Sequence, residues 1–257
     1  MIKKSNITIH KPEDFSKMRD AGRLAAKTLD YIAPFVNPGV STGELNDLCH
    51  DFIIKHNAIP APLNYKGFPK SICTSVNHVV CHGIPVYDKK LQNGDIINID
   101  VTVILDGWHG DTSRMYFVGD KVPIKAKRLC EVTYQAMMLG IQQIKPGVLL
   151  SEVGRVIQEY SEKNGCSVVR DFCGHGIGKI FHAPPNILHY YDKENDIPLV
   201  EGMFFTVEPM INAGKYQVKM LDDGWTAVTR DKSLSAQYEH TIGVTAVGYE
   251  IFTLAVD

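Results

Sequence analysis

The chain has 257 residues, of which 44% are hydrophobic and 22% are charged, so it is long enough to bury a full hydrophobic core. Its 27 Lys and Arg residues nearly balance its 29 Asp and Glu residues, and the net charge of -2 argues against a strongly basic nucleic-acid-binding protein and against an acidic disordered tail. No apolar run approaches the roughly 18 residues of a membrane-spanning helix, and the N-terminal residues do not have the pattern of a signal peptide. The six cysteines include no CxxC pair, which is typical of reduced thiols. We therefore expect a globular cytoplasmic protein, and proteins of this kind are most often enzymes.

The first half of the chain predicts two helices followed by a hairpin. Apolar residues recur at helical spacing over residues 12–35. A capping box formed by Ser41 and Glu44 predicts the start of a second helix. The β-branched run at residues 96–104 predicts a strand, and Asp106–Gly107 is a strong signal for a tight hairpin turn.

The second half predicts the same sequence of elements. Helical patterns cover residues 123–144 and 151–163, and the second of these stops at Asn164–Gly165, which is a typical helix end. Residues 204–208 and 239–247 have the composition of strands. Helix pairs therefore alternate with strands in both halves of the chain.

The two halves also share residues at a constant offset of 108 positions, as from Pro38 to Pro146. The segment PGV at 38–40 recurs at 146–148, and residues 91–100 align without a gap to residues 199–208. We interpret this as an internal duplication, with halves of about 12–120 and 121–250 in a single catalytic domain spanning 1–257. The predicted class is α+β, with outer helices around a curved antiparallel sheet.

Carboxylates occur where the strands should be apolar. If the turn in the first half has two residues, Thr102 lies opposite Asp111 and Asp100 lies opposite Ser113, so that the two aspartates are diagonal neighbours on one face, roughly 7–8 Å apart. A turn of another length would break this arrangement. Because two such carboxylates repel one another, a divalent cation between them is the simplest explanation.

The second half supplies a matching pair of acids. Glu208 aligns with Asp100, and Glu239 lies in the second strand-like stretch. A single acid of this kind is more often a solvated surface residue, but four in matched positions favour one shared site. His175 lies in the glycine-rich segment CGHGIG, which indicates a close approach of the backbone to another group. The other histidines with a distinctive setting are His82, in a similar small-residue turn, and His182, seven residues after His175.

Seven further histidines have no pattern that sets them apart: His10, His50, His56, His78, His109, His189 and His240.

These motifs, taken in order, resemble those of the methionine aminopeptidases of the bacterial type, in metallopeptidase family M24. The segments NHVVCHGIP, GDIINIDV, DGWHGDTSRMY and FCGHGIGKIFHAPPNI carry the resemblance, which covers nearly the whole chain. We expect neither the zinc-binding N-terminal extension of eukaryotic type I enzymes nor the helical insertion of type II enzymes, for which there is no room between His182 and Glu239. One departure is Pro62, where relatives often have a small or thiol residue. The resemblance implies the pita-bread fold, with two pseudo-symmetric halves.

The resemblance also implies the metal ligands. Asp111 and Glu239 would bridge two divalent ions, Asp100 would complete one ion, and His175 and Glu208 would complete the other. Such an oxygen-rich set suits Co, Mn, Fe or Zn, and four carboxylates balance the charge of two divalent ions. A hydroxide that bridges the ions would attack the first peptide carbonyl.

Further residues would bind and process the substrate. Glu208 would also shuttle the proton, and His82 and His182 would form hydrogen bonds with the substrate and with the developing charge. For the apolar pocket the resemblance points to five residues, each equally compatible with simple core packing: Tyr65, Phe68, Cys73, Phe181 and Trp225. The expected reaction is removal of N-terminal methionine from nascent proteins and peptides when the second residue is small.

The expected partners are the N-termini of nascent polypeptides near the ribosome, with no direct contact to nucleic acid or membrane and with the chain as a monomer. Two alternatives remain. One is proline-directed aminopeptidase or dipeptidase activity, although such relatives usually carry an extra N-terminal domain. The other is a non-catalytic binding protein, although such relatives have lost metal ligands. Cysteine-based catalysis at Cys73, Cys81 or Cys173 is a further alternative, but the sequence shows no matching Cys-His-Asn arrangement.

Overall fold

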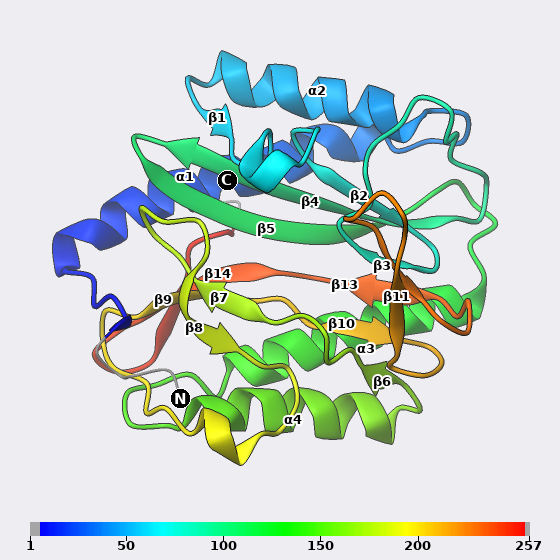
Figure 1. Cartoon of the computed structure of the whole chain (residues 1–257). Helices are drawn as coiled ribbons and strands as arrows, with labels where there is room; N and C mark the ends of the chain where they lie inside the picture. The colour runs from blue at the N-terminus through cyan, green and yellow to red at the C-terminus, as the bar shows by residue number, and fades with distance from the viewer. Residues whose placement is uncertain (1–5, 255–257) are drawn as a thin grey trace.

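The structure is a computed structural model that describes residues 6–254 of the chain, and its layers are visible in Figure 1. Two helices of the first half, α1 (Pro12–Ile32) and α2 (Thr42–Lys55), lie along one side, and α3 (Ile124–Ile141) and α4 (Leu150–Lys163) lie along the other. The strands lie between these two helical layers. Within the described residues, no helix is both long enough and apolar enough to cross a membrane.

The local signals for the helices act as the sequence predicts. The Ser41 hydroxyl accepts a hydrogen bond from the Glu44 backbone N–H at 3.1 Å, and the Glu44 carboxylate accepts one from the Ser41 N–H at 2.7 Å, which confirms the capping box. The first helix ends earlier than predicted, at Ile32, because Pro34 has no N–H to donate to the carbonyl oxygen four residues earlier. Residues Ala33–Phe35 form a short 3₁₀ turn instead.

The predicted hairpin is formed by β4 (Ile96–Leu105) and β5 (Trp108–Phe117). Asp106 and Gly107 both have positive φ, at 49° and 80°, as the tight hairpin turn requires. The register pairs Thr102 with Asp111 and confirms the predicted alignment of the strands. Asp100 lies in the middle of β4, which continues to Leu105 before the turn.

All strand pairs in the described residues are antiparallel, and they form four hydrogen-bonded sheets rather than one continuous sheet. The first joins the hairpin to β1 (Ile59–Pro60) and β2 (Cys73–Val76). The largest has the order β15 (Tyr249–Ile251), β14 (His240–Val244), β9 (Phe204–Val207), β7 (Gly174–Gly176) and β8 (Ala183–Ile187).

Two small sheets complete the fold. One consists of β13 (Ser235–Gln237), β10 (Met210–Asn212) and β6 (Ser167–Val168), and the other of β11 (Val218–Met220), β12 (Ala227–Thr229) and β3 (Val79–Cys81). Two further 3₁₀ turns span Tyr65–Gly67 and Lys193–Asn195. Glu208 lies just after β9 and Glu239 just before β14, so the predicted strands at 204–208 and 239–247 are both shorter than expected. The proline that follows Glu208 has no N–H to donate to a sheet.

Each half packs its helix pair onto its own strands. In the first half, Leu29 and Leu45 are buried with Ile99 of β4, and in the second half Met137 and Ile157 are buried with other core residues that include Phe205 of β9. The halves meet where β5 lies beside β14, and a single backbone bridge joins Ser113 to Glu239 there. This seam brings acids from both halves together.

Candidate metal centre

Three of the five predicted ligands converge at the seam. Asp111 projects from β5, His175 from β7, and Glu239 from the residue before β14, and one ligand atom of each lies within 4.8 Å of the others. All three side chains are buried. One acid from each half of the chain therefore meets the other at this point, although the two are far apart in the sequence.

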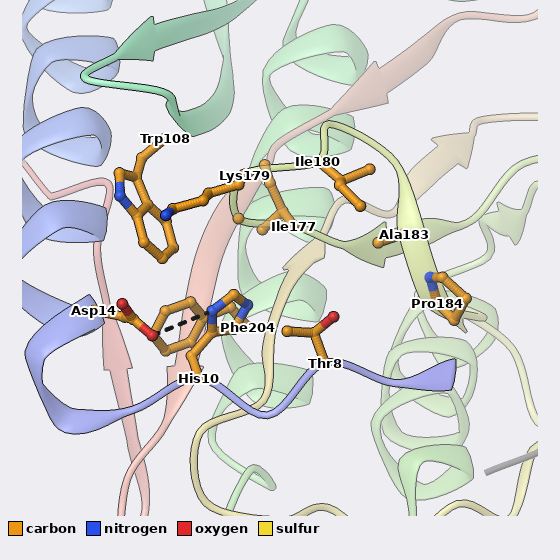
Figure 2. Close-up of a pocket in the computed structure, with 11 residues that line it drawn as sticks. Thr8, His10, Asp14, Trp108, Ile177, Lys179, Ile180, Ala183, Pro184 and Phe204 are labelled. Carbon is orange, nitrogen blue, oxygen red and sulfur yellow. Dashed lines mark ion pairs between the residues drawn. The ribbon is translucent and has the colours of Figure 1, made fainter. Parts of the chain in front are cut away.

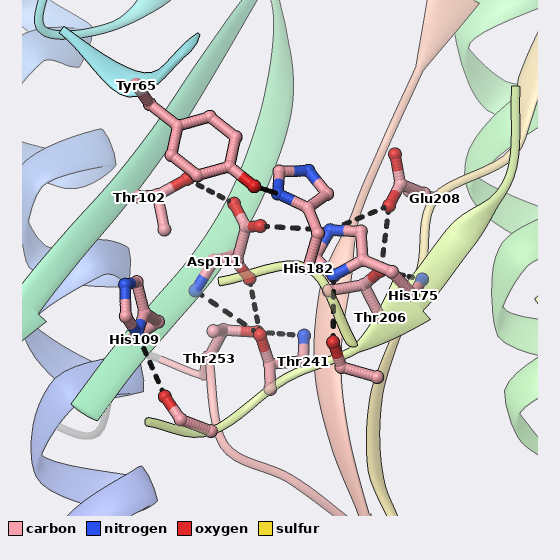
Figure 3. A network of polar contacts seen from close by, with 12 residues as sticks. Tyr65, Thr102, His109, Asp111, His175, His182, Thr206, Glu208, Thr241 and Thr253 are labelled. Carbon is pink, nitrogen blue, oxygen red and sulfur yellow. Dashed lines mark hydrogen bonds and ion pairs between the residues drawn. The ribbon is translucent and has the colours of Figure 1, made fainter. Parts of the chain in front are cut away.

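Glu208 borders the same group. The Nε2 atom of His175 is 3.6 Å from Oε1 of Glu208 and 3.5 Å from Oδ2 of Asp111, so the imidazole lies between the two carboxylates (Figure 3). Asp100 lines the same cavity but is not part of the tight group of three.

Hydroxyl groups that the sequence analysis did not assign to the site hold these carboxylates. Thr102 donates a hydrogen bond to Oδ1 of Asp111 at 2.7 Å, and Thr206 donates one to Oε1 of Glu208 at 2.7 Å. Thr206 also accepts from the backbone N–H of His175 at 3.0 Å. Strand alternation is the signal that could have found Thr102 and Thr206, because each lies opposite a ligand or two residues from one.

A buried histidine sets the backbone at Glu208. Nε2 of His189 accepts a hydrogen bond from the Glu208 N–H at 3.0 Å. Burial lowers the pKa of His189 to about 3, so the ring stays neutral and keeps this acceptor. No local sequence pattern predicts this contact, because it depends on how the segments that follow β8 and β9 pack against each other.

The acids are crowded in a poorly solvated space. Burial, followed by the nearby carboxylates, raises the pKa of Asp100 and of Glu239 well above the ordinary value for a carboxyl group. Burial also raises the pKa of Glu208 to about 7, although His175 opposes this shift. Among the described residues, no Lys or Arg forms an ion pair with these carboxylates.

The donor set fits a divalent metal ion. Burial alone would lower the pKa of His175, but the hydrogen bond with Asp111 and the charge of Glu208 raise it, so the site attracts positive charge. Nδ1 of His175 faces the carbonyl oxygen of Gly176 at 3.2 Å and donates to it, which leaves Nε2 free to act as a ligand. Carboxylate oxygens with one imidazole are suited to hard or borderline divalent ions.

The centre opens into a cavity of about 500 Å³. Every predicted site residue lines it, including the proposed substrate-contacting residues Tyr65, Phe68, Cys73, His82, Phe181, His182 and Trp225. Phe68 and Trp225 meet edge to face with their ring centroids 5.2 Å apart. Pro62, the noted departure from the family pattern, also lies in this lining, together with Phe172 and Met210, which the sequence analysis did not select.

The two additional histidines flank the ligand group. His182 has its ring centroid 4.2 Å from that of His175, and its Nδ1 lies 3.0 Å from the hydroxyl of Tyr65. His82 has a left-handed backbone with φ of 55°, which is uncommon outside glycine and typical of functional turns. Burial lowers the pKa of both histidines, so both rings are neutral near pH 7.

A second, smaller cavity of about 240 Å³ adjoins the first and shares Ala183 and Pro184 with it. Figure 2 shows that Trp108, Phe204 and His10 lie around it. It contains none of the predicted ligands.

Comparisons with known proteins give a consistent result. A model of metallopeptidase family M24 matches residues 16–246. The chain is 67% identical over 250 residues to a methionine aminopeptidase from Rickettsia prowazekii, covering 97% of this chain and 96% of the relative. It is 55% identical over 252 residues to a methionine aminopeptidase from Escherichia coli, covering 98% and 95%. A crystal structure of the Rickettsia prowazekii methionine aminopeptidase superposes with a TM-score of 0.94, covering 96% of this chain and 100% of that one.

Proposed function

The chain belongs to metallopeptidase family M24, and from this premise we propose that it is a metal-dependent aminopeptidase that removes the N-terminal methionine from peptides and nascent proteins. The observation that carries the proposal is the buried group of carboxylates and one imidazole at the base of a largely apolar cavity. The pita-bread architecture of its relatives places two halves around this group, as the fold of this chain does.

We assign the ligands of two divalent ions to five residues. By the family resemblance, Asp111 and Glu239 would be shared by both ions, Asp100 would complete one ion, and His175 with Glu208 would complete the other. Two ions balance the charge of four carboxylates, and when bound they would polarise the scissile carbonyl and make a water molecule acidic enough to attack it. Which metal serves in the cell depends on availability as well as on geometry.

The protein's own side chains would handle the protons and the substrate. Glu208 would take the proton from the attacking water and deliver it to the leaving nitrogen, as a general base and acid. His182 lies beside the ligand group and would donate a hydrogen bond to the oxygen that gains negative charge. His82 faces the same cavity and would bind the peptide near its new amino end.

The apolar walls suit an unbranched thioether side chain. Tyr65, Phe68, Phe181 and Trp225 present aromatic surfaces, and Cys73 adds a small polarisable one. Methionine is flexible and makes favourable contacts with aromatic rings. The pocket would therefore accept the first side chain while the metal centre holds the amino group.

We also propose that the substrates are nascent chains near the ribosome and that the protein acts as a cytoplasmic monomer. All six cysteines are free, which agrees with a reducing compartment. Light scattering of the purified protein would test the oligomeric state.

The experiment that tests the proposed function is an assay of amino-acid release from three peptides. Metal-loaded enzyme should release methionine from Met-Ala-Ser and much less from Met-Lys-Ser, because the family resemblance implies a shallow pocket for the second residue. It should not cleave a peptide that begins Ala-Pro. Preferential cleavage of the Ala-Pro peptide would establish a proline-directed enzyme, and binding of all three without release would establish a non-catalytic binding protein.

A further inference from the structure

Residues 177–182 form a loop that joins two parts of the proposed active site. His175 lies two residues before the loop, and Phe181 and His182 lie at its end. The path of this loop therefore decides where His182 stands relative to the metal ligands. Gly178 lies near the middle of the loop and is in contact with His109 and His10.

His109 of β5 forms two hydrogen bonds with the loop. Both its backbone N–H and its ring Nδ1 lie 2.9 Å from the carbonyl oxygen of Gly178. A carbonyl can only accept, so Nδ1 carries the proton and His109 donates twice to one oxygen. The imidazole of His109 also stacks on the ring of Phe181, with centroids 5.4 Å apart and an interplanar angle of 17°.

Phe181 in turn packs against His182. The centroids of these two rings are 4.2 Å apart, and Phe181 also packs at 4.8 Å against Tyr65, whose hydroxyl contacts His182. A continuous set of packed rings thus runs from His109 to His182 (Figure 3 labels both ends).

His10 supports the loop from the opposite side. A Cβ atom at Gly178 would lie 2.7 Å from Cε1 of His10, so the two are in close contact. The His10 ring stacks on Phe204 at 4.2 Å and 6°, and its backbone N–H donates to Gly202 at 2.8 Å (Figure 2). The His10 imidazole is therefore itself well anchored, and its side chain is only 9% exposed.

We propose that His109 is a positioning residue that fixes Phe181 and His182 through the Gly178 carbonyl and the ring stack, with His10 as a brace behind the loop. The inference rests on the role proposed above for His182. His109 does not line the cavity and is not one of the proposed ligands, so it would act by holding the loop. Misplacement of a reacting group by about 1 Å can cost on the order of 10²-fold in rate.

Two replacements separate the two contacts of His109. His109→Asn keeps a side-chain N–H in the place of Nδ1 but removes the ring, and His109→Phe keeps the ring but removes the donor. We expect each to lower kcat by about tenfold or more while KM and bound metal change little, and His109→Ala to lower kcat further, toward the roughly 10²-fold limit for a misplaced group. In a His182→Ala background the same replacements should change kcat by less than about twofold, because the group they position is gone.

His56 provides a matched control. Its Nδ1 also lies 2.7 Å from a backbone carbonyl, that of Phe52, and its ring also packs on a phenylalanine, at 4.2 Å, but it caps the outer helix α2. His56→Asn should leave kcat unchanged. Hydrogen exchange of the amides of residues 177–182 provides a readout without catalysis, and it should speed up in the His109 variants but not in His56→Asn.

The result that would overturn the inference is an equal loss of kcat in the wild-type and His182→Ala backgrounds, or unchanged exchange in the loop. Loss of bound metal in His109→Asn would likewise reject it, by assigning His109 to the support of Asp111 instead. If the wild type releases no methionine, the proposed function fails, while the exchange measurement still decides whether His109 holds the loop.

Discussion

At the scale of single residues, the geometry of the site depends on the residues that hold the proposed metal ligands as well as on the ligands themselves. Thr102 and Thr206 each place a hydroxyl 2.7 Å from a carboxylate oxygen and so help to fix the orientation of that carboxylate. Such contacts orient a ligand and commonly alter metal affinity or activity by 10–100-fold when removed. The proposed acidic ligands stand out in the sequence because acids are rare in apolar segments, whereas a threonine in a strand is unremarkable.

Replacement of Glu208 by Gln tests its double role. The change removes a ligand charge and a group that can exchange a proton, so turnover with saturating metal should fall by at least about 10²-fold. Steady-state kinetics on Met-Ala-Ser would measure this. Thr28→Ser, buried in α1 far from the centre, serves as a control that should remain active. A Glu208→Gln enzyme within about threefold of wild type would remove Glu208 from the mechanism.

Replacement of His182 by Ala should separate transition-state stabilisation from metal binding. His182 lies outside the group of three close ligands, so bound metal should remain at the wild-type stoichiometry. The loss of one hydrogen-bond donor to developing charge typically costs about 2.7–4 kcal/mol, which corresponds to a fall in kcat of about 10²–10³-fold. Metal analysis beside the kinetics checks both parts. A variant that loses metal would make His182 a ligand.

At the scale of elements, structure follows the sequence where the cause is local. The Asp106–Gly107 turn fixes the register of β4 and β5 because both residues adopt positive φ, and that register sets the face on which Asp111 projects. The ends of elements are less predictable, as at Ile32 and around Glu208, where a nearby proline cuts a pattern short. Contacts such as His189 with Glu208 arise only after packing and leave no local signal.

The cap of α2 gives a prediction confined to stability. Ser41 is fully buried, and its hydroxyl satisfies the N–H of Glu44 at the start of the helix. Ser41→Ala should lower the free energy of unfolding by about 1 kcal/mol, since that is the typical cost of a lost N-cap. Urea unfolding of the metal-free protein would measure this loss of stability. The kcat of the metal-loaded variant should be unchanged. No loss of stability would show that Glu44 alone, through its bond to the Ser41 N–H, suffices as a cap.

At the scale of the whole molecule, the two halves bring like charges together at their seam, and the fold must tolerate them. Asp100 and Glu239 have raised pKa values, and that of Glu208 is about 7. Metal-free protein therefore binds more protons at these carboxylates when folded than when unfolded. The free energy of unfolding of the metal-free protein should therefore depend on pH through these carboxylates.

In metal-free protein, the raised pKa values of these groups lower the free energy of unfolding as pH rises. A carboxyl group with a raised folded-state pKa costs no stability below its ordinary pKa of about 4, where it is protonated in both states. The cost grows as pH rises from there to the folded-state value, which is about 7 for Glu208. His175, whose pKa is also raised, contributes stability below about pH 6.5 that is lost as pH rises further. The carboxylates and His175 therefore both lower the free energy of unfolding of the metal-free protein at alkaline pH.

Metal should reverse this trend, because it binds the deprotonated oxygens of the folded centre and not the scattered ligands of the unfolded chain. At about a hundredfold excess over Kd, binding adds roughly 2.7 kcal/mol to the free energy of unfolding. Protons compete for the same oxygens, so the effective affinity and hence the gain in Tm on adding Mn²⁺ should be larger at pH 8 than at pH 5.5. Comparing Tm with and without metal at each pH cancels contributions from buried groups elsewhere, such as His240, whose lowered pKa affects both forms alike. Asp111→Asn should reduce the gain at pH 8, and a gain that is independent of pH, or that survives this replacement in full, would mean that the carboxylates of the two halves do not share one metal centre.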